Sequence, residues 1–126
     1  MYKIVYLPNF PENPSNPARA NLVTNVIEIN LFAWQFLSPK QREFILLHEC
    51  GHLKKKTFDE SIADNYALDN MKFDKEYTLY DFVKTVRMVA KDDPNRERKA
   101  EIMCLERESK KGNKKAKKLL KTYNYE

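Results

Sequence analysis

The chain has 126 residues, 42% of them hydrophobic, which is enough for one domain with a core of its own. No apolar run approaches the roughly 20 residues of a membrane span, so we expect a soluble protein. The N-terminus is too short and too aromatic for a signal peptide, so we expect a cytoplasmic protein. The two cysteines, Cys50 and Cys104, form no recognisable disulfide framework and are expected to be reduced.

The net charge of +5 is concentrated at the carboxyl end of the chain. Residues 1–98 hold 14 basic and 14 acidic side chains, whereas residues 99–126 hold nine basic and four acidic ones. Any electrostatic partner, such as a nucleic acid, would therefore meet the C-terminus. We do not favour a nucleic-acid partner, because charge runs usually solvate a helix face and no recognition motif accompanies the lysines.

The first third of the chain predicts short strands. Residues 2–7 are rich in aromatic and β-branched residues and are followed by a proline, as is typical of a short strand. Residues 8–20 hold four prolines and are expected to lack regular structure. Residues 22–31 contain a second strand, in which apolar and polar residues alternate. Residues 31–37 are ambiguous, and we favour a short helical turn.

A well-defined helix is predicted over residues 39–55. Ser38 can cap its start, Pro39 suits the first helical position, and Gln41 can complete a capping box. Lysines at the carboxyl end suit the helix dipole.

This helix carries His48, Glu49 and His52 in a His-Glu-x-x-His pattern within an apolar run. Residues i and i+4 share a helix face, so the two imidazoles can bind one metal ion. Glu49 lies beside them, where it can reach a water on the metal. Burying these groups without partners would be costly, and the chain has no other histidine. The pattern therefore predicts a zinc site of the metallopeptidase kind.

A helix over residues 60–71, capped by Asp59, is expected to supply the third ligand. Catalytic zinc sites use three protein ligands and a water. Cys50 faces away from the histidines, so Glu60 is the best candidate, with Asp59 and Asp64 as alternatives. Asp64 can otherwise accept a hydrogen bond from the non-ligating nitrogen of a liganding histidine.

The remainder of the chain is predicted to be helical. One helix begins at Thr78 and keeps a 3.6-residue apolar stripe to residue 90. Another runs from Asp93 to about residue 110, and Gly112 separates it from a lysine-rich C-terminal helix at about 113–123. The apolar face of that last helix consists of Ala116, Leu119, Leu120 and Tyr123. Five lysines are expected to face the solvent while Leu119 and Leu120 dock: Lys114, Lys115, Lys117, Lys118 and Lys121.

Together these elements predict an α+β fold in a single domain over residues 1–126. A small sheet of two or three strands would pack on the buried motif helix, and the C-terminal half would be helical.

The His-Glu-x-x-His pattern, followed by Glu-Ser-Ile-Ala-Asp at 60–64, resembles the two motifs of the gluzincin metallopeptidases. Residues 27–52 are similar to the ImmA/IrrE type in particular, in which a strand precedes the motif helix and a glycine precedes its second histidine. The resemblance covers roughly residues 25–71. It implies the following roles: zinc ligands at His48, His52 and Glu60, a general base at Glu49, and a partner of a liganding histidine at Asp64.

The resemblance implies a small intracellular zinc endopeptidase that cleaves a specific protein target, such as a regulator. Zinc would lower the pKa of its water toward about 7, and Glu49 would carry the proton to the leaving amine. Tyr66, Tyr77 or Tyr80 could stabilise the oxyanion. The strand within residues 25–31 could pair its edge with an extended peptide.

Two other functions compete with a peptidase. One is a non-catalytic binding module that keeps zinc for stability. The other is a nucleic-acid-associated protein that acts through its basic C-terminus. The oligomeric state is not indicated by the sequence.

Overall fold

The computed structural model describes the backbone of residues 2–124 and the side chains of residues 2–122. The side chain of Tyr123, assigned above to an apolar helix face, lies outside these described residues. The chain divides into two compact units, Met1–Asp74 and Lys75–Glu126. The α+β class is confirmed, with a three-stranded sheet and a helical C-terminal half within the described range. The single domain stays a prediction, because two compact units can belong to one domain.

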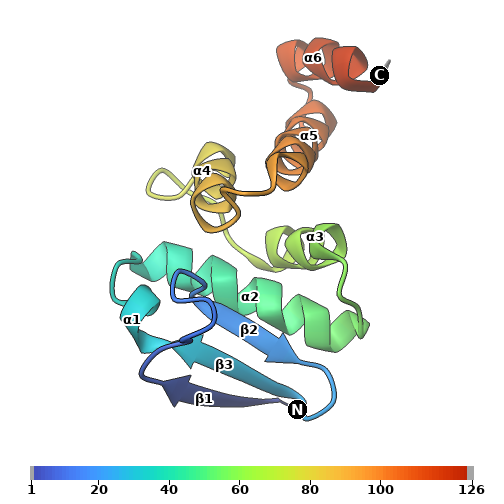
Figure 1. Cartoon of the computed structure of the whole chain (residues 1–126). Coiled ribbons are helices and arrows are strands. Elements are labelled where there is room, and N and C mark those ends of the chain that lie inside the picture. Colours follow the sequence, from blue (N-terminus) through green and yellow to red (C-terminus); the bar gives the residue numbers. More distant parts are fainter. Residues whose placement is uncertain (1, 125–126) are drawn as a thin grey trace. The chain divides into compact units, whose positions relative to one another are not determined.

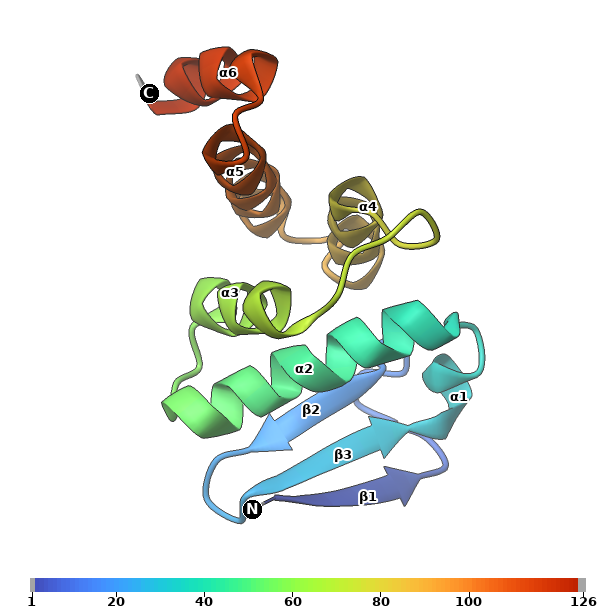
Figure 2. The same cartoon turned by 180° about the vertical axis from the view of Figure 1, so that it is seen from behind.

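The N-terminal unit is built from a small sheet and three helices. Its elements are β1 (Lys3–Leu7), β2 (Ala18–Asn21), β3 (Val26–Asn30), α1 (Leu31–Trp34), α2 (Pro39–Lys55) and α3 (Glu60–Asn70). β3 lies in the centre, parallel to β1 and antiparallel to β2 (Figure 1). α2 runs across the sheet, and α3 runs alongside α2 in both views (Figure 2). The predicted packing of the sheet on the motif helix is therefore confirmed.

The expectation that residues 8–20 lack regular structure is wrong at their carboxyl end, where β2 begins at Ala18. The four prolines all precede this strand, so none removes a ladder donor from it. Arg19 on β2 binds Glu28 on β3 at 2.8 Å, and its guanidinium covers the ring of Phe10 at 4.0 Å. Tertiary pairing thus makes a strand from a sequence with weak local preference.

The expectation that the strand within residues 25–31 offers an edge to a peptide is also wrong. β3 is paired on both sides, so its backbone hydrogen-bonding groups are already used. Ile27 and Ile29 are fully buried, as is Phe44 of α2, and these side chains form the core of the unit. β3 therefore contributes side chains to the core and has no free edge for a further strand.

The ends of α2 follow the predicted signals. Ser38 accepts a hydrogen bond from the backbone N–H of Gln41, and the Gln41 side chain accepts one from the backbone N–H of Ser38. The helix ends at Lys55, and its C-cap residue Lys56 adopts the left-handed conformation with φ 49°. This turn reverses the chain and leads directly into α3.

The C-terminal unit consists of three helices: α4 (Leu79–Val89), α5 (Pro94–Lys110) and α6 (Lys114–Asn124). The predicted caps Thr78 and Asp93 begin α4 and α5. On α6, Ala116 is buried, whereas Leu119 is 48% exposed. The predicted docking through Leu119 is therefore wrong, whereas Leu120, the other leucine of the prediction, is half-buried. The five α6 lysines are exposed, as expected.

None of the helices within residues 2–124 is both long enough and apolar enough to cross a membrane.

Candidate metal centre

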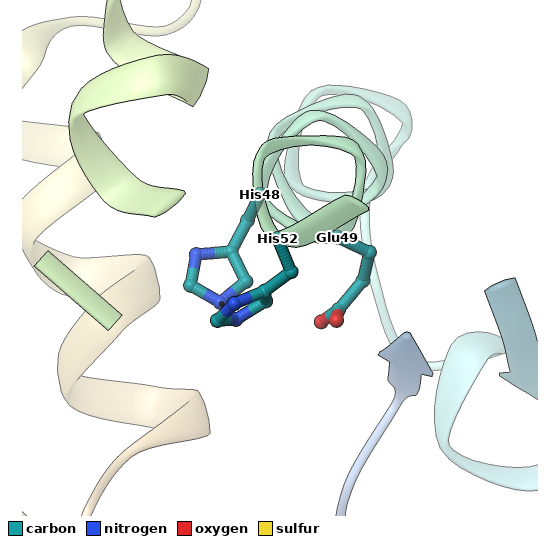
Figure 3. A group of neighbouring side chains, drawn as sticks. All are labelled: His48, Glu49 and His52. Atoms are coloured by element: carbon teal, nitrogen blue, oxygen red, sulfur yellow. Dashed lines mark hydrogen bonds between the residues drawn. The ribbon is translucent and has the colours of Figure 1, made fainter. Parts of the chain in front are cut away.

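The site lies on the buried carboxyl-terminal half of α2. His48, Glu49 and His52 are 4%, 8% and 7% exposed. Their side chains project from the same side of the helix, with the two imidazoles together and the Glu49 carboxylate beside them (Figure 3). One potential ligand atom from each residue lies within 4.8 Å of the others. This buried group can hold a metal ion.

α3 approaches α2 closely at Gly51. A Cβ atom on Gly51 would lie 3.0 Å from the Ala63 Cα and from the Tyr66 Cβ, and 3.1 Å from the Ala63 carbonyl oxygen. Only glycine allows the two backbones to come this near without a shift. The close contact brings the first two turns of α3 beside the histidines.

The Nδ1 atoms of both histidines face hydrogen-bond acceptors. His48 Nδ1 lies 2.7 Å from Asp64 Oδ1, and Asp64 is 1% exposed. His52 Nδ1 lies 2.8 Å from the carbonyl oxygen of Thr57. A carbonyl only accepts, so His52 carries its proton on Nδ1, and the Asp64 carboxylate favours the same tautomer for His48. Each neutral imidazole then points the lone pair of Nε2 away from these partners.

Glu60 meets the histidines on the Nε2 side. Its Oε1 lies 2.7 Å from His52 Nε2 and 3.4 Å from His48 Nε2, while the two Nε2 atoms are 3.1 Å apart. Three electron-rich atoms therefore converge, and they require a positive charge between them. Two imidazole nitrogens and a carboxylate oxygen are a donor set that fits a divalent metal ion.

The raised pKa values of the two imidazoles also indicate that their surroundings favour a positive charge. Burial lowers the pKa of His48, but the hydrogen bonds to Asp64 and Glu60 outweigh it and raise the pKa to about 9. Burial likewise lowers the pKa of His52, but the hydrogen bond with Glu60 outweighs burial. The pKa of His52 is therefore raised above its usual value. The surrounding carboxylates thus favour a cation at this position, which a proton or a metal ion can supply.

The alternative ligand Asp59, and Cys50, which was not expected to be a ligand, have partners away from the histidines. The Asp59 carboxylate accepts hydrogen bonds from the backbone N–H groups of Ser61 and Ile62 and so caps α3. The Cys50 thiol lies on a different face of α2 from the histidines, and its interaction with Tyr2 raises the pKa of the Tyr2 hydroxyl to about 12. Of the acids considered from the sequence, Glu60 lies on the Nε2 side and Asp64 on the Nδ1 side, as assigned. Their functional roles stay predictions.

The tyrosines considered for the oxyanion have different surroundings. Tyr66 lies on α3 beside Gly51. Tyr77 belongs to the helical unit, is 4% exposed, and shares a 2.7 Å hydrogen bond with Thr85. Tyr80, in the same unit, is 62% exposed. No role at the metal centre is assigned to any of them.

Two contributors were missed by sequence reasoning. The Thr57 carbonyl orients His52, and a backbone carbonyl leaves no trace in residue type. Gly51 sets the distance between α2 and α3, and its position inside a predicted helix could have indicated this role. Glycine inside a helix costs about 1 kcal/mol relative to alanine, so its presence indicates a packing reason.

The comparisons with known proteins give no relative. No family model matches the chain, and no curated protein or solved structure matches it.

Proposed function

We propose that the protein is a zinc-dependent peptidase of the gluzincin type, which hydrolyses a peptide bond in a specific protein target. The observation that carries this proposal is the convergence of His48 Nε2, His52 Nε2 and Glu60 Oε1, with Glu49 beside them. Two histidines and one glutamate are the protein ligands of one known class of catalytic zinc site, which keeps a further position for water.

His48, His52 and Glu60 would hold the zinc ion. Asp64 and the Thr57 carbonyl would keep the two imidazoles in the ligating tautomer and orientation. Bound zinc would supply Lewis acidity, which lowers the pKa of water toward about 7 and polarises a carbonyl. Glu60 has a side chain that is 44% exposed, so the centre is accessible from solvent on that side.

Glu49 is the proposed general base. Its position directly after His48 places its carboxylate beside the two imidazoles (Figure 3). It would accept a proton from the attacking water and deliver it to the leaving amine. Burial excludes bulk water from this carboxylate and so strengthens its interactions with the reacting groups.

An extended substrate would pair with β2. β2 contacts α2 and pairs with β3 on one side only within the described residues. Its second edge can therefore add a strand by main-chain hydrogen bonds. This assignment replaces the central strand, β3.

The experiment is cleavage-site profiling of a denatured proteome by labelling of new N-termini. Zinc-loaded wild-type protein is compared with Glu49→Gln, which nearly preserves side-chain shape but removes the base. Glu43→Gln is the control, because Glu43 lies on the same helix and is 48% exposed. We expect cleavage by wild type and Glu43→Gln, and none by Glu49→Gln, although all three bind zinc. Equal cleavage by Glu49→Gln would refute the mechanism, and zinc binding without any cleavage would favour a non-catalytic module.

A further inference from the structure

The helical unit contains an open groove that is unrelated to the metal centre. It encloses about 520 Å³ and is lined by residues of α4, of α5 and of α6. Its apolar lining includes Leu79, Val83, Leu105 and Leu119. Tyr80, also in the lining, is 62% exposed, and Leu119 is 48% exposed. The unit therefore leaves apolar side chains open to solvent along a concave surface, which is a feature of docking sites.

The lysines of α6 are not equivalent with respect to this groove. At about 100° per residue, Lys115 lies roughly 40° from Leu119 around the helix, and Lys118 lies roughly 100° away on the same flank. The buried Ala116 lies on the opposite flank of Leu119. Lys115 and Lys118 do not line the groove themselves, but they lie on the flank of Leu119 away from Ala116, closer in angle to the groove-lining Leu119 than the other three lysines. Lys114, Lys117 and Lys121 lie about 140–160° from Leu119 and point away.

The charges on the groove are divided between its walls. Residues 114–124 contain five lysines and no acidic residue, so α6 forms a purely cationic rim. Glu101 and Glu108 line the α5 side together with Arg87 of α4. Arg87 forms an ion pair with Glu97, and Glu108 lies 3.9 Å from Lys111, so these charges are partly offset within the unit. The α6 side of the groove therefore carries a net positive charge.

We propose that this groove docks an amphipathic helix of a partner protein, whose apolar stripe is flanked by acidic residues on the side that meets α6. The apolar lining matches side chains at i, i+3 or i+4 and i+7 of such a helix, and Lys115 and Lys118 match its acidic flank. A nucleic acid has no apolar side chains to fill the groove. An anionic membrane would meet a concave surface that carries Glu101 and Glu108, which is unfavourable for interfacial binding.

The test uses three labelled peptides that share one leucine stripe and carry Glu, Gln or Lys on one flank only, the flank proposed to meet α6. Binding to the full chain is measured by fluorescence anisotropy, with single-stranded DNA and anionic vesicles as further probes. We expect the Glu peptide to bind most tightly and the Lys peptide most weakly. Lys115→Glu/Lys118→Glu should weaken binding of the Glu peptide about 10-fold or more, whereas Lys117→Glu/Lys121→Glu should change it about 2-fold or less. Both double variants change the net charge equally.

Leu119→Ser tests the apolar part of the groove and should weaken binding of the Glu peptide and of the Gln peptide. Retained helical circular dichroism shows that these variants are folded. The proposal would be overturned if no peptide bound with a Kd below about 1 mM, if both lysine pairs caused the same loss, or if DNA or vesicles bound more tightly than the Glu peptide.

Discussion

The two compact units differ in which side chains they bury: the first buries ionisable groups, and the second leaves apolar groups partly exposed. In Met1–Asp74, the ionisable side chains of His48 and Asp64 are nearly fully buried, and each has a partner at hydrogen-bond distance. In Lys75–Glu126, lysines lie in solvent and the apolar residues Tyr80 and Leu119 stay partly exposed. Burial of polar groups costs free energy that only hydrogen-bond partners offset, so a buried and oriented cluster indicates a site, whereas exposed apolar groups indicate a surface for partners. Substitutions in the first unit should therefore change metal binding, and those in the second should not.

The largest expected effect comes from His48→Ala. Removing this imidazole deletes a ligand and leaves the buried carboxylate of Asp64 without its histidine partner. We expect nearly complete loss of zinc, measured by elemental analysis after gel filtration. His52→Ala should lose zinc as well. Retention of about one zinc per chain in either variant would contradict the assignment of the centre.

The next effect concerns the third ligand. Glu60→Ala should strip most of the zinc, while Glu43→Ala, which removes a similarly exposed carboxylate from α2, should retain it. If Glu60 were only a first-turn acid of α3, its loss would cost about 0.3–1 kcal/mol of stability and leave the metal in place. The zinc content of the two variants decides between these readings.

A smaller effect is expected for Asp64→Ala. The substitution keeps all three proposed ligands but removes the acceptor that orients His48, so zinc affinity should fall about 10–100-fold. The neighbouring Asn65→Ala is the control, because it shortens the next side chain of α3, which donates to the Ser61 carbonyl. Competition with a chelating dye measures both affinities. Equal affinities for the two variants would remove Asp64 from the site.

The two glycines give a matched test of spacing. Gly51→Ala places a Cβ 3.0 Å from the Ala63 backbone and should displace α3 by a few tenths of an ångström, weakening zinc binding several-fold. Gly112→Ala has open space but a φ of +94°, so it should lower stability by about 1 kcal/mol. Only Gly51→Ala should change the zinc affinity in the dye competition. A loss of zinc affinity in Gly112→Ala would mean that the effect is not local.

The smallest expected effect belongs to Leu119→Ser. Because Leu119 is already 48% exposed, the free energy of unfolding in urea should change by about 0.5 kcal/mol or less. Met103→Ala in the same unit removes a side chain that is 5% exposed and should cost about 2–5 kcal/mol. Similar losses for the two variants would mean that Leu119 is packed rather than open to a partner.

Most helices could be predicted from sequence because their starts carry local chemistry. Ser38 with Gln41, Asp59, Thr78 and Asp93 all act as the caps that their residue types indicated. The spacing of the histidines likewise fixed their common helix face. These features depend on residues three or four apart and so are visible in one sequence.

The features that were missed depend on distant contacts. β2 forms only because β3 pairs with it, and the central position of β3 follows from a parallel pairing with β1 that no local pattern encodes. The exposure of Leu119, which shares the predicted apolar face with the buried Ala116, depends on how α5 and α6 meet. The Thr57 carbonyl acts through its backbone, which is the same for every residue type.

The most direct test of the central claim is X-ray absorption spectroscopy at the zinc edge on the zinc-loaded protein. We predict a first shell of nitrogen and oxygen at about 2.0–2.2 Å with imidazole scattering from two histidines. Glu60→Ala, at the same total zinc concentration, should show a much weaker imidazole signal, because most of its zinc would be unbound. A sulfur ligand at about 2.3 Å, which would implicate Cys50 or Cys104, or a shell without imidazole, would contradict the account.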